Sequence, residues 1–195
     1  MKLSLPPKPI LLPSPVMVVG SYSFNGRPNI MTVAWGGIVS SKPPCVSISI
    51  REATLTYHNI KQVRAFTVNI PSESYVFEAD FAGMVSGRDA DKFSEARLTA
   101  EKSERVFAPI VAEFPYALEC RVVREIEIGS HTMFIGEIIG IVADDTVLNQ
   151  KQLLPDIEKV RPVMWGSFGN AGYYGIGEKL GNAFSAGNDL KRGRK

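Results

Sequence analysis

The chain is poor in the residues that build metal centres and disulfide scaffolds. Its 195 residues include two cysteines, Cys45 and Cys120, and two histidines, His58 and His131. The cysteines have no Cys-x-x-Cys spacing and lie in β-rich segments, so buried free thiols fit better than a disulfide or a metal site. With only His58 and His131 as imidazole donors, the sequence does not favour a structural zinc site, and we expect no metal.

The chain also lacks a strong charge of one sign and long hydrophobic runs. Its formal net charge of +2 is too small to indicate a nucleic-acid-binding protein, and we interpret the basic end at residues 191–195 (KRGRK) as solvated. No apolar run reaches the roughly 20 residues of a membrane-spanning helix. Prolines occupy the N-terminal positions where the apolar part of a secretion signal would lie. We therefore expect a cytoplasmic protein that binds neither nucleic acid nor a membrane.

Several sequence motifs of common enzyme classes are missing. The chain has no G-x-S-x-G elbow, no P-loop and no H-E-x-x-H pattern. Residues 175–181 (GIGEKLG) resemble a dinucleotide fingerprint, but the third glycine comes one residue late. Because no βαβ unit follows this segment, we do not interpret it as a Rossmann site.

What is present is a set of β-strand signals. Asn25-Gly26 predicts a tight hairpin, and Gly136 and Gly140 interrupt a long apolar segment, as in strands that bend around a barrel. The pattern predicts mainly β structure, a closed or partly closed antiparallel barrel with peripheral helices. The expected strands are residues 15–23, 29–35, 45–50, 65–70, 116–128 and 131–143.

The remaining segments predict helices and irregular connections. Helices are expected at residues 54–63 and at 72–83, the second with a Ser72 cap, and a polar loop at 85–98 leads into a short helix. Residues 99–110 lack a regular pattern, and the pattern of residues 150–160 fits a helix or a strand. With no internal repeat or linker, we expect one domain over residues 1–195, with an N-terminal arm at 1–14 and a basic tail at 188–195.

The most informative stretch runs from residue 29 to residue 59 (NIMTVAWGGIVSSKPPCVSISIREATLTYHN). A strand ends near Trp35, and Gly36-Gly37 would let another group approach the backbone closely. Arg51 ends the next strand, and a helix opens near Thr54 or Thr56. Free N–H groups at a helix N-terminus together with an arginine form an anion site in outline. An ordinary N-cap beside a surface arginine is the alternative.

Three further side chains have both a structural and a functional interpretation. His131 follows the Gly129-Ser130 turn and is either a hydrogen-bonded structural residue or a group beside a redox ring. Lys92 is by default a solvated lysine. Trp35 is either a core residue or part of a binding surface, because it lies next to two glycines at a strand end. Together these features favour a phosphorylated, flat, aromatic ligand such as a flavin.

Four ordered motifs carry a family resemblance. The segment NIMTVAWGGIVSSKPPCVSISIREATLTYHNI, followed by AFTVNIP, DKF and GSHTMFIGEI, resembles the flavin reductase-like family of FMN-binding split barrels. The later segment GYYGIGEKLGNAFSAG resembles the flavoredoxin branch of that family. The similarity covers roughly residues 10 to 187. It implies a six-stranded antiparallel split barrel with Greek-key character, and a homodimer that binds FMN non-covalently near the subunit interface.

The resemblance also implies roles for particular residues. His131 matches a histidine that lies where a nicotinamide stacks on the flavin, which makes it the candidate catalytic residue. Arg51 and the Thr56 hydroxyl match the family's phosphate site, with Thr54 and Asn59 nearby, and Lys92 matches a lysine that approaches the flavin. The expected cofactor-binding residues are Asn29, Thr32, Val33, Ala34, Trp35, Arg51, Thr54, Thr56, Asn59 and Lys92, with residues 32–35 acting mostly through the backbone.

The implied function is electron transfer through bound FMN, with NAD(P)H or a redox protein as the donor. Many two-component flavin reductases of the family carry serine at the position of Trp35 and lack the long C-terminal tail, which favours a member that holds FMN tightly. The alternatives are an NAD(P)H-dependent flavin or ferric reductase, and a non-enzymatic flavin-binding or interaction module.

Overall fold

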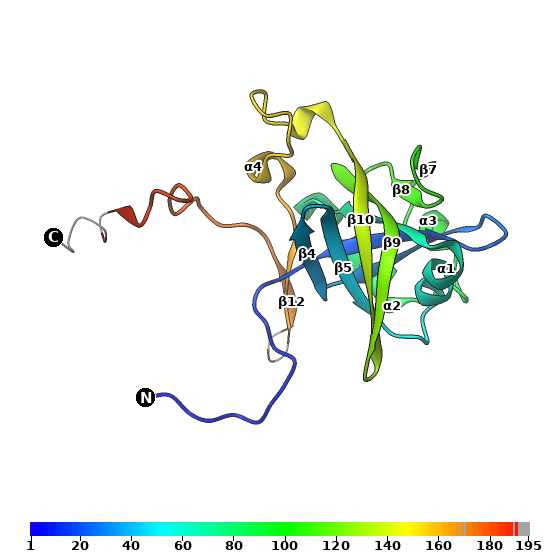
Figure 1. The fold of residues 1–195 in the computed structure, drawn as a ribbon, viewed down its shortest axis with the longest axis horizontal. Coiled ribbons are helices and arrows are strands. Elements are labelled where there is room, and N and C mark those ends of the chain that lie inside the picture. Colours follow the sequence, from blue (N-terminus) through cyan, green and yellow to red (C-terminus); the bar gives the residue numbers. More distant parts are fainter. Residues whose placement is uncertain (168, 170, 189, 191–195) are drawn as a thin grey trace.

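The protein is built around one antiparallel sheet (Figure 1). The computed structural model describes all residues except 168, 170, 189 and 191–195. Within this part of the chain, seven strands form the main sheet in the order β3-β2-β6-β9-β10-β5-β4. Their bounds are β2 (Met17–Tyr22), β3 (Pro28–Val33), β4 (Gly36–Ser41), β5 (Pro44–Ile50), β6 (Ala65–Ile70), β9 (Tyr116–Ile128) and β10 (His131–Ala143).

Glycines shape this sheet at its turns and bends. Gly26 adopts a φ of 81° in the turn between β2 and β3, and Gly129 adopts a φ of 55° between β9 and β10. The pairing of β9 with β10 shifts register beside Gly136 and again beside Gly140. A side chain at Gly136 would collide with the Phe66 ring, so the missing Cβ lets this ring pack against the bent strand. The predicted hairpin turn and the glycine-interrupted strand are both confirmed.

The main sheet has one strand more than the six predicted, although the mainly β class is correct. The additional strand is β4, which pairs with β5 after a turn at residues 42 and 43. Gly36 and Gly37 at its start have low β propensity, so the sequence did not predict this strand. The group that approaches Gly36 closely is the carbonyl of Ser47 on β5, so this glycine serves sheet packing rather than a ligand.

Two smaller sheets lie outside the main sheet. The segment predicted to be irregular contains a hairpin of β7 (Ala100–Lys102) and β8 (Pro109–Val111). In a three-stranded sheet, β11 (Met164–Gly166) lies between β1 (Ser14–Pro15) and β12 (Gly172–Tyr174).

The helices lie near the predicted positions. Thr54 caps α1 (Leu55–Val63) by accepting a hydrogen bond from the Tyr57 amide. The second helix begins as a 3₁₀ turn η1 (Glu73–Tyr75) and continues as α2 (Val76–Met84). Ser72 occupies the N-cap position, as predicted, but its side chain makes no cap hydrogen bond. The remaining helical elements are short, namely α3 (Lys92–Glu95), η2 (Asp145–Val147) and α4 (Ile157–Val160).

Two apolar clusters form the core. One is built from side chains of the main sheet and of α1, and it includes Phe66, Phe134 and Ile60. The other lies between α2, α3 and β3 and includes Ile30 and Phe93. Helix α2 therefore packs on β3, the edge strand of the sheet, and this contact positions the site described below.

Both cysteines are free and buried, as expected from the sequence. Burial raises the pKa of the Cys120 thiol to about 12, which keeps it protonated and unreactive at neutral pH.

Among the described residues, no helix is long and apolar enough to cross a membrane. The N-terminal arm and the C-terminal segment both run away from the sheets (Figure 1). The basic run at 191–195, predicted to be solvated, lies outside the described residues.

Candidate functional site

A chamber with a volume of about 470 Å³, the central chamber, lies at the end of β3. Its walls come from the end of β3 and the residues after it, from the end of β5, and from α2, β10 and β11. The lining residues are Met31, Thr32, Val33, Ala34, Trp35, Ser49, Ile50, Arg51, Gly83, His131 and Trp165. The predicted strand end at residues 32–35 therefore shares one chamber with His131 and Arg51.

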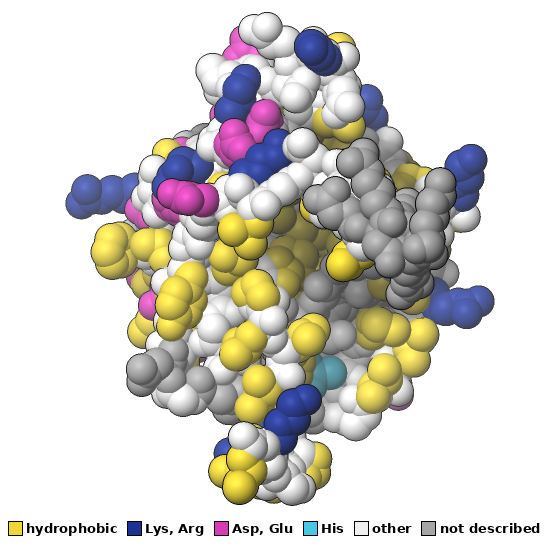
Figure 2. Space-filling model, turned by 90° about the vertical axis from the view of Figure 1, so that its left-hand side faces the viewer, with side chains coloured by type: hydrophobic (Ala, Val, Ile, Leu, Met, Phe, Trp, Pro, Cys, Tyr) yellow, Lys and Arg dark blue, Asp and Glu magenta, His cyan; other side chains and the backbone are white. Residues whose placement is uncertain are grey.

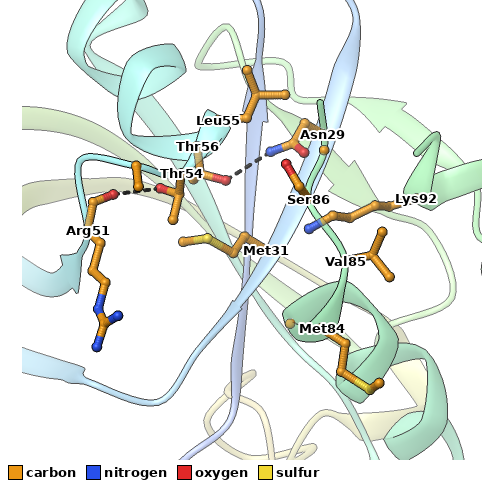
Figure 3. A pocket seen from close by; sticks show the side chains of 13 residues that line it. Asn29, Met31, Arg51, Thr54, Leu55, Thr56, Met84, Val85, Ser86 and Lys92 are labelled. Atoms are coloured by element: carbon orange, nitrogen blue, oxygen red, sulfur yellow. Dashed lines mark hydrogen bonds between the residues drawn. The ribbon is translucent and has the colours of Figure 1, made fainter. Parts of the chain in front are cut away.

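A smaller pocket of about 210 Å³, the anion pocket, adjoins the central chamber through the shared residues Met31, Arg51 and Gly83. It lies at the N-terminus of α1 (Figure 3), where Leu55 and Thr56 contribute to its wall. The first N–H groups of a helix have no partner within the helix and carry partial positive charge. None of the thirteen residues that line the pocket, all within the described chain, is acidic. The pocket is therefore suited to an anion.

Thr56 presents its hydroxyl to this pocket through a buried polar network. The Asn29 amide nitrogen donates to Thr56 Oγ1 at 2.9 Å, which leaves the Thr56 hydroxyl hydrogen free to donate to a ligand. Asn29 and Asn59 also donate to the Ser21 hydroxyl, at 3.3 Å and 3.1 Å. Asn59 is absent from the lining of both chambers, so it supports the pocket through Ser21 and Asn29 rather than by direct contact.

Thr54 has a structural role in addition to its place in the lining. Its hydroxyl donates to the Arg51 carbonyl at 2.9 Å and accepts from the Tyr57 amide at 3.2 Å. The single hydroxyl hydrogen is therefore already used. Thr54 fixes the turn that carries Arg51 and the start of α1, which corresponds to the ordinary N-cap considered in the sequence.

Arg51 and Lys92 approach the anion pocket from opposite sides (Figure 3). Neither forms an ion pair with any described residue. Lys92 is 4% exposed, which overturns its default interpretation as a solvated lysine. Its ammonium donates to the Ala82 carbonyl of α2 at 2.6 Å. Burial lowers the pKa of Lys92 to about 8, because water no longer solvates the charged form well.

His131 and Trp35 pack against each other at the other end of the site. Their ring centroids lie 4.8 Å apart, with an interplanar angle of 39°. Burial, and then the positive charge of Arg51, lower the pKa of His131 below its ordinary value. A His131 ring that is mostly neutral at pH 7 can donate or accept a hydrogen bond in the central chamber.

The side chains of the predicted residues Thr32, Val33 and Ala34 are either engaged in packing contacts or small. The Thr32 hydroxyl donates to the Ala79 carbonyl of α2, and the Val33 side chain is buried in the core. Ala34 adds little side chain. These three side chains therefore leave the backbone as the group that could contact a ligand in the central chamber.

Sequence reasoning missed two contributions to the site. Trp165 on β11 lines the central chamber, and the only signal for it was a tryptophan within a glycine-rich segment. The loop after α2 lines the anion pocket, including Gly87. A Cβ at Gly87 would collide with the Asn29 side chain, so this glycine lets the loop close over the network around Thr56.

Comparisons with known proteins agree with this arrangement. The family described as "Flavin reductase like domain" matches residues 11–165. Flavoredoxin of Desulfovibrio vulgaris (Miyazaki F) has a TM-score of 0.90 and 46% identity, over 96% of this chain and 100% of that chain. Flavoredoxin from Methanosarcina acetivorans has a TM-score of 0.89 and 28% identity, over 97% of this chain and 100% of that chain.

A sequence relative supports the same assignment. An uncharacterised protein of Archaeoglobus fulgidus is 35% identical over 143 residues, which cover 73% of this chain and 78% of that protein. The family expectation drawn from the motifs is thereby confirmed, as is the split-barrel fold class. The chain belongs to the flavin reductase-like domain family and is similar to the flavoredoxins within it.

Proposed function

We propose that the protein is a flavoredoxin-like oxidoreductase that binds FMN non-covalently and transfers electrons through it. The observation that carries this proposal is the adjoining pair of chambers, one suited to an anion and one lined by backbone, aromatic and apolar groups. FMN has the same two parts, a phosphate and a flat ring system.

The phosphate would be held in the anion pocket. Arg51 can donate two parallel hydrogen bonds to phosphate oxygens. The Thr56 hydroxyl and the first amides of α1 add further donors, and the first turn of α1 contains no acidic residue. Lys92 adds a positive charge from the other side. These groups fit a phosphate, because an anion would partner two cations that form no ion pair in the described chain.

The ring system would lie in the central chamber along residues 32–35. Backbone N–H and C=O groups can pair with the polar edge of such a ring, while Met31, Ile50 and Trp35 offer apolar and aromatic surface. A bound flavin supplies the capacity to accept and release electrons, and the protein's task is to bind it, orient it and set its electrostatic surroundings. Arg51 also lines the central chamber, so its positive charge would favour the more negative, reduced state of a ring bound there.

Visible absorbance of the desalted protein tests this proposal, followed by titration of flavin-free protein with FMN and with riboflavin. Riboflavin lacks the phosphate and is otherwise the same molecule, so their affinity ratio measures the contribution of the anion pocket. We expect FMN to bind at least about 100-fold more tightly, since charge-assisted hydrogen bonds are each worth on the order of 1.5–3 kcal/mol. Equal affinities would contradict the phosphate assignment, and failure of both ligands to bind would contradict the function.

The second candidate is an NAD(P)H-dependent flavin or ferric reductase. The observation in its favour is that His131 lines the central chamber, where it could contact a donor stacked on the ring. Steady NAD(P)H oxidation with free FMN or a ferric chelate in excess would support this candidate. If bound flavin is reduced only by a protein donor, the electron-carrier function is favoured.

The third candidate, a non-enzymatic flavin-binding or interaction module, predicts no oxidation of any donor. An interaction through the basic tail would be lost on deletion of residues 191–195, which lie outside the described chain.

Assembly into a homodimer is part of the proposal. Ile38 and Val39 on the edge strand β4 are 68% and 50% exposed. Figure 2 shows hydrophobic side chains spread over the face toward which both chain termini project. An exposed apolar edge of this kind would be covered by a second copy. Sedimentation equilibrium tests the homodimer, and a monomer at micromolar concentration would contradict it.

We also propose a cytoplasmic location for the protein. Its two buried free thiols are consistent with a reducing compartment.

A further inference from the structure

A third chamber, about 300 Å³ in volume, adjoins the central chamber on the side of β11 and β12. We call it the Asp80 chamber. The two chambers share Thr32, Ala34, Gly83 and Trp165 as lining residues. Whatever occupies the Asp80 chamber therefore lies directly beside the space that we assign to the flavin ring.

One carboxylate provides the charge of this chamber. Asp80 on α2 accepts a hydrogen bond from the Tyr173 hydroxyl at 2.7 Å, but within the described chain it forms no ion pair. No lysine, arginine or histidine is among the residues that line the chamber. Burial, and then the hydrogen bond to Asp80, raise the pKa of Tyr173, so the phenol keeps its proton and remains a donor. The chamber thus has a negative charge that no cation of the described residues balances.

The surrounding walls are aromatic and apolar. Trp165 and Tyr173 are direct partners across β11 and β12, and both side chains line the chamber. Val16 and the thioether of Met84 complete the walls used in this argument. Aromatic faces attract cations, and a partly buried carboxylate adds to that attraction.

We propose that the Asp80 chamber binds a small, planar organic cation of the N-alkylated heteroaromatic type. A neutral aromatic molecule would gain the contacts with Trp165 and Tyr173 but leave Asp80 without a counter-charge. An anion would be repelled by Asp80 and drawn instead to Arg51 and Lys92 in the anion pocket. The anion pocket and the Asp80 chamber share Gly83 and Met84 but carry opposite charge, with lysine and arginine in the first and a carboxylate in the second. The position of this cation beside a flavin ring rests on the proposed function, whereas its binding does not.

The test compares N-methylquinolinium with 4-methylquinoline by calorimetric titration of the FMN-loaded protein at pH 8. The two probes have the same number of heavy atoms and the same planar ring system, but only the first carries a permanent charge. We expect the cation to bind at least about ten-fold more tightly, from the combined attraction of the aromatic faces and the carboxylate. Equal affinities would overturn the proposal.

Variants test whether the cationic probe binds in the Asp80 chamber. Asp80→Asn keeps an acceptor for Tyr173 and should reduce the affinity of the cation to that of the neutral probe, without changing the neutral probe's affinity. Asp145→Asn on η2 makes the same charge change away from the chamber and should have no effect. A cation affinity unchanged by Asp80→Asn would overturn the proposal. Should Asp80→Asn fail to fold, Trp165→Leu gives a second test, because it should lower the ratio of the two affinities several-fold.

Measuring the FMN content of the protein distinguishes failure of the cation proposal from failure of the proposed function. Protein that takes up no FMN contradicts the proposed function, but its Asp80 chamber can still be titrated with both probes. Cation binding to flavin-free protein that disappears on loading with FMN would show that the flavin itself fills the chamber, and would overturn the proposal.

Discussion

The Lys92 ammonium donates a 2.6 Å hydrogen bond to the Ala82 carbonyl, and this bond holds the buried charge of α3 against the end of α2. Within the described chain no carboxylate balances that charge. Because burial lowers the pKa of Lys92 from 10.5 in the unfolded chain to about 8, the folded protein releases this proton more readily than the unfolded chain does. Between these two values the unfolded state binds more protons, so stability must rise with pH.

We predict that Lys92→Met raises the free energy of unfolding of the flavin-free protein at pH 7, by on the order of 1 kcal/mol after solvent screening. The gain should be constant below pH 8 and should diminish as the pH rises from 8 to 10.5, where the wild-type lysine becomes neutral before unfolding. Urea denaturation of both proteins at several pH values measures this difference. The same substitution should weaken FMN binding, because it removes a positive charge from the anion pocket. Loss of stability together with unchanged FMN affinity would show that Lys92 is only a structural residue.

Arg51→Ala should weaken FMN binding by about 10- to 100-fold, the range expected for a charge-assisted hydrogen bond to phosphate. Riboflavin affinity should change little, since the ring does not need this guanidinium. Arg124→Ala is the matched control, because Arg124 is also exposed but lies on β9, outside both chambers. Fluorescence quenching of each flavin gives the dissociation constants. A parallel loss of FMN and riboflavin affinity would place Arg51 beside the ring instead of the phosphate.

Much of the fold could be predicted because period-two alternation and turn glycines are local signals. The hairpin at Asn25-Gly26 and the paired long strands around Gly129 are both of this kind. Strand β4 was missed because its glycines have little intrinsic β preference, and the packing of Gly36 on the Ser47 carbonyl is visible only after folding.

The site was predicted from residue types at element ends and from the family resemblance, which alone pointed to Lys92. Arg51 and Thr56 follow one another closely along the chain, so their proximity was foreseeable. Lys92 and Trp165 reach the site through tertiary contacts of α3 and β11, and local patterns carry no information about such contacts. The different roles of Thr54, as a cap, and Asn59, as a support behind Asn29, likewise depend on where each hydroxyl or amide hydrogen points.

Asn59→Ala should affect the site without touching a ligand. It removes the amide that donates to Ser21 and leaves a buried hydroxyl with one partner fewer, which should lower the free energy of unfolding by about 1–3 kcal/mol. Asn29 would lose part of the network that orients it toward Thr56, so FMN affinity should fall by a few-fold, less than for Thr56→Val. Denaturant unfolding and FMN titration measure the two effects. If Asn59→Ala weakens FMN as strongly as Thr56→Val, Asn59 contacts the cofactor directly.

Trp35→Ala should raise the pKa of His131. The indole covers the imidazole at 4.8 Å, and burial is the larger of the two causes that lower this pKa. Removing the indole lets water reach the ring and stabilise its charged form, so the pKa should move up toward its ordinary value. Arg51→Ala should move it in the same direction by a smaller amount, because the charge of Arg51 is the second cause. Titration of the His131 ring protons by NMR measures both shifts, with the exposed His58 as internal control. A larger effect of Arg51→Ala than of Trp35→Ala would show that charge, not burial, sets the protonation of His131.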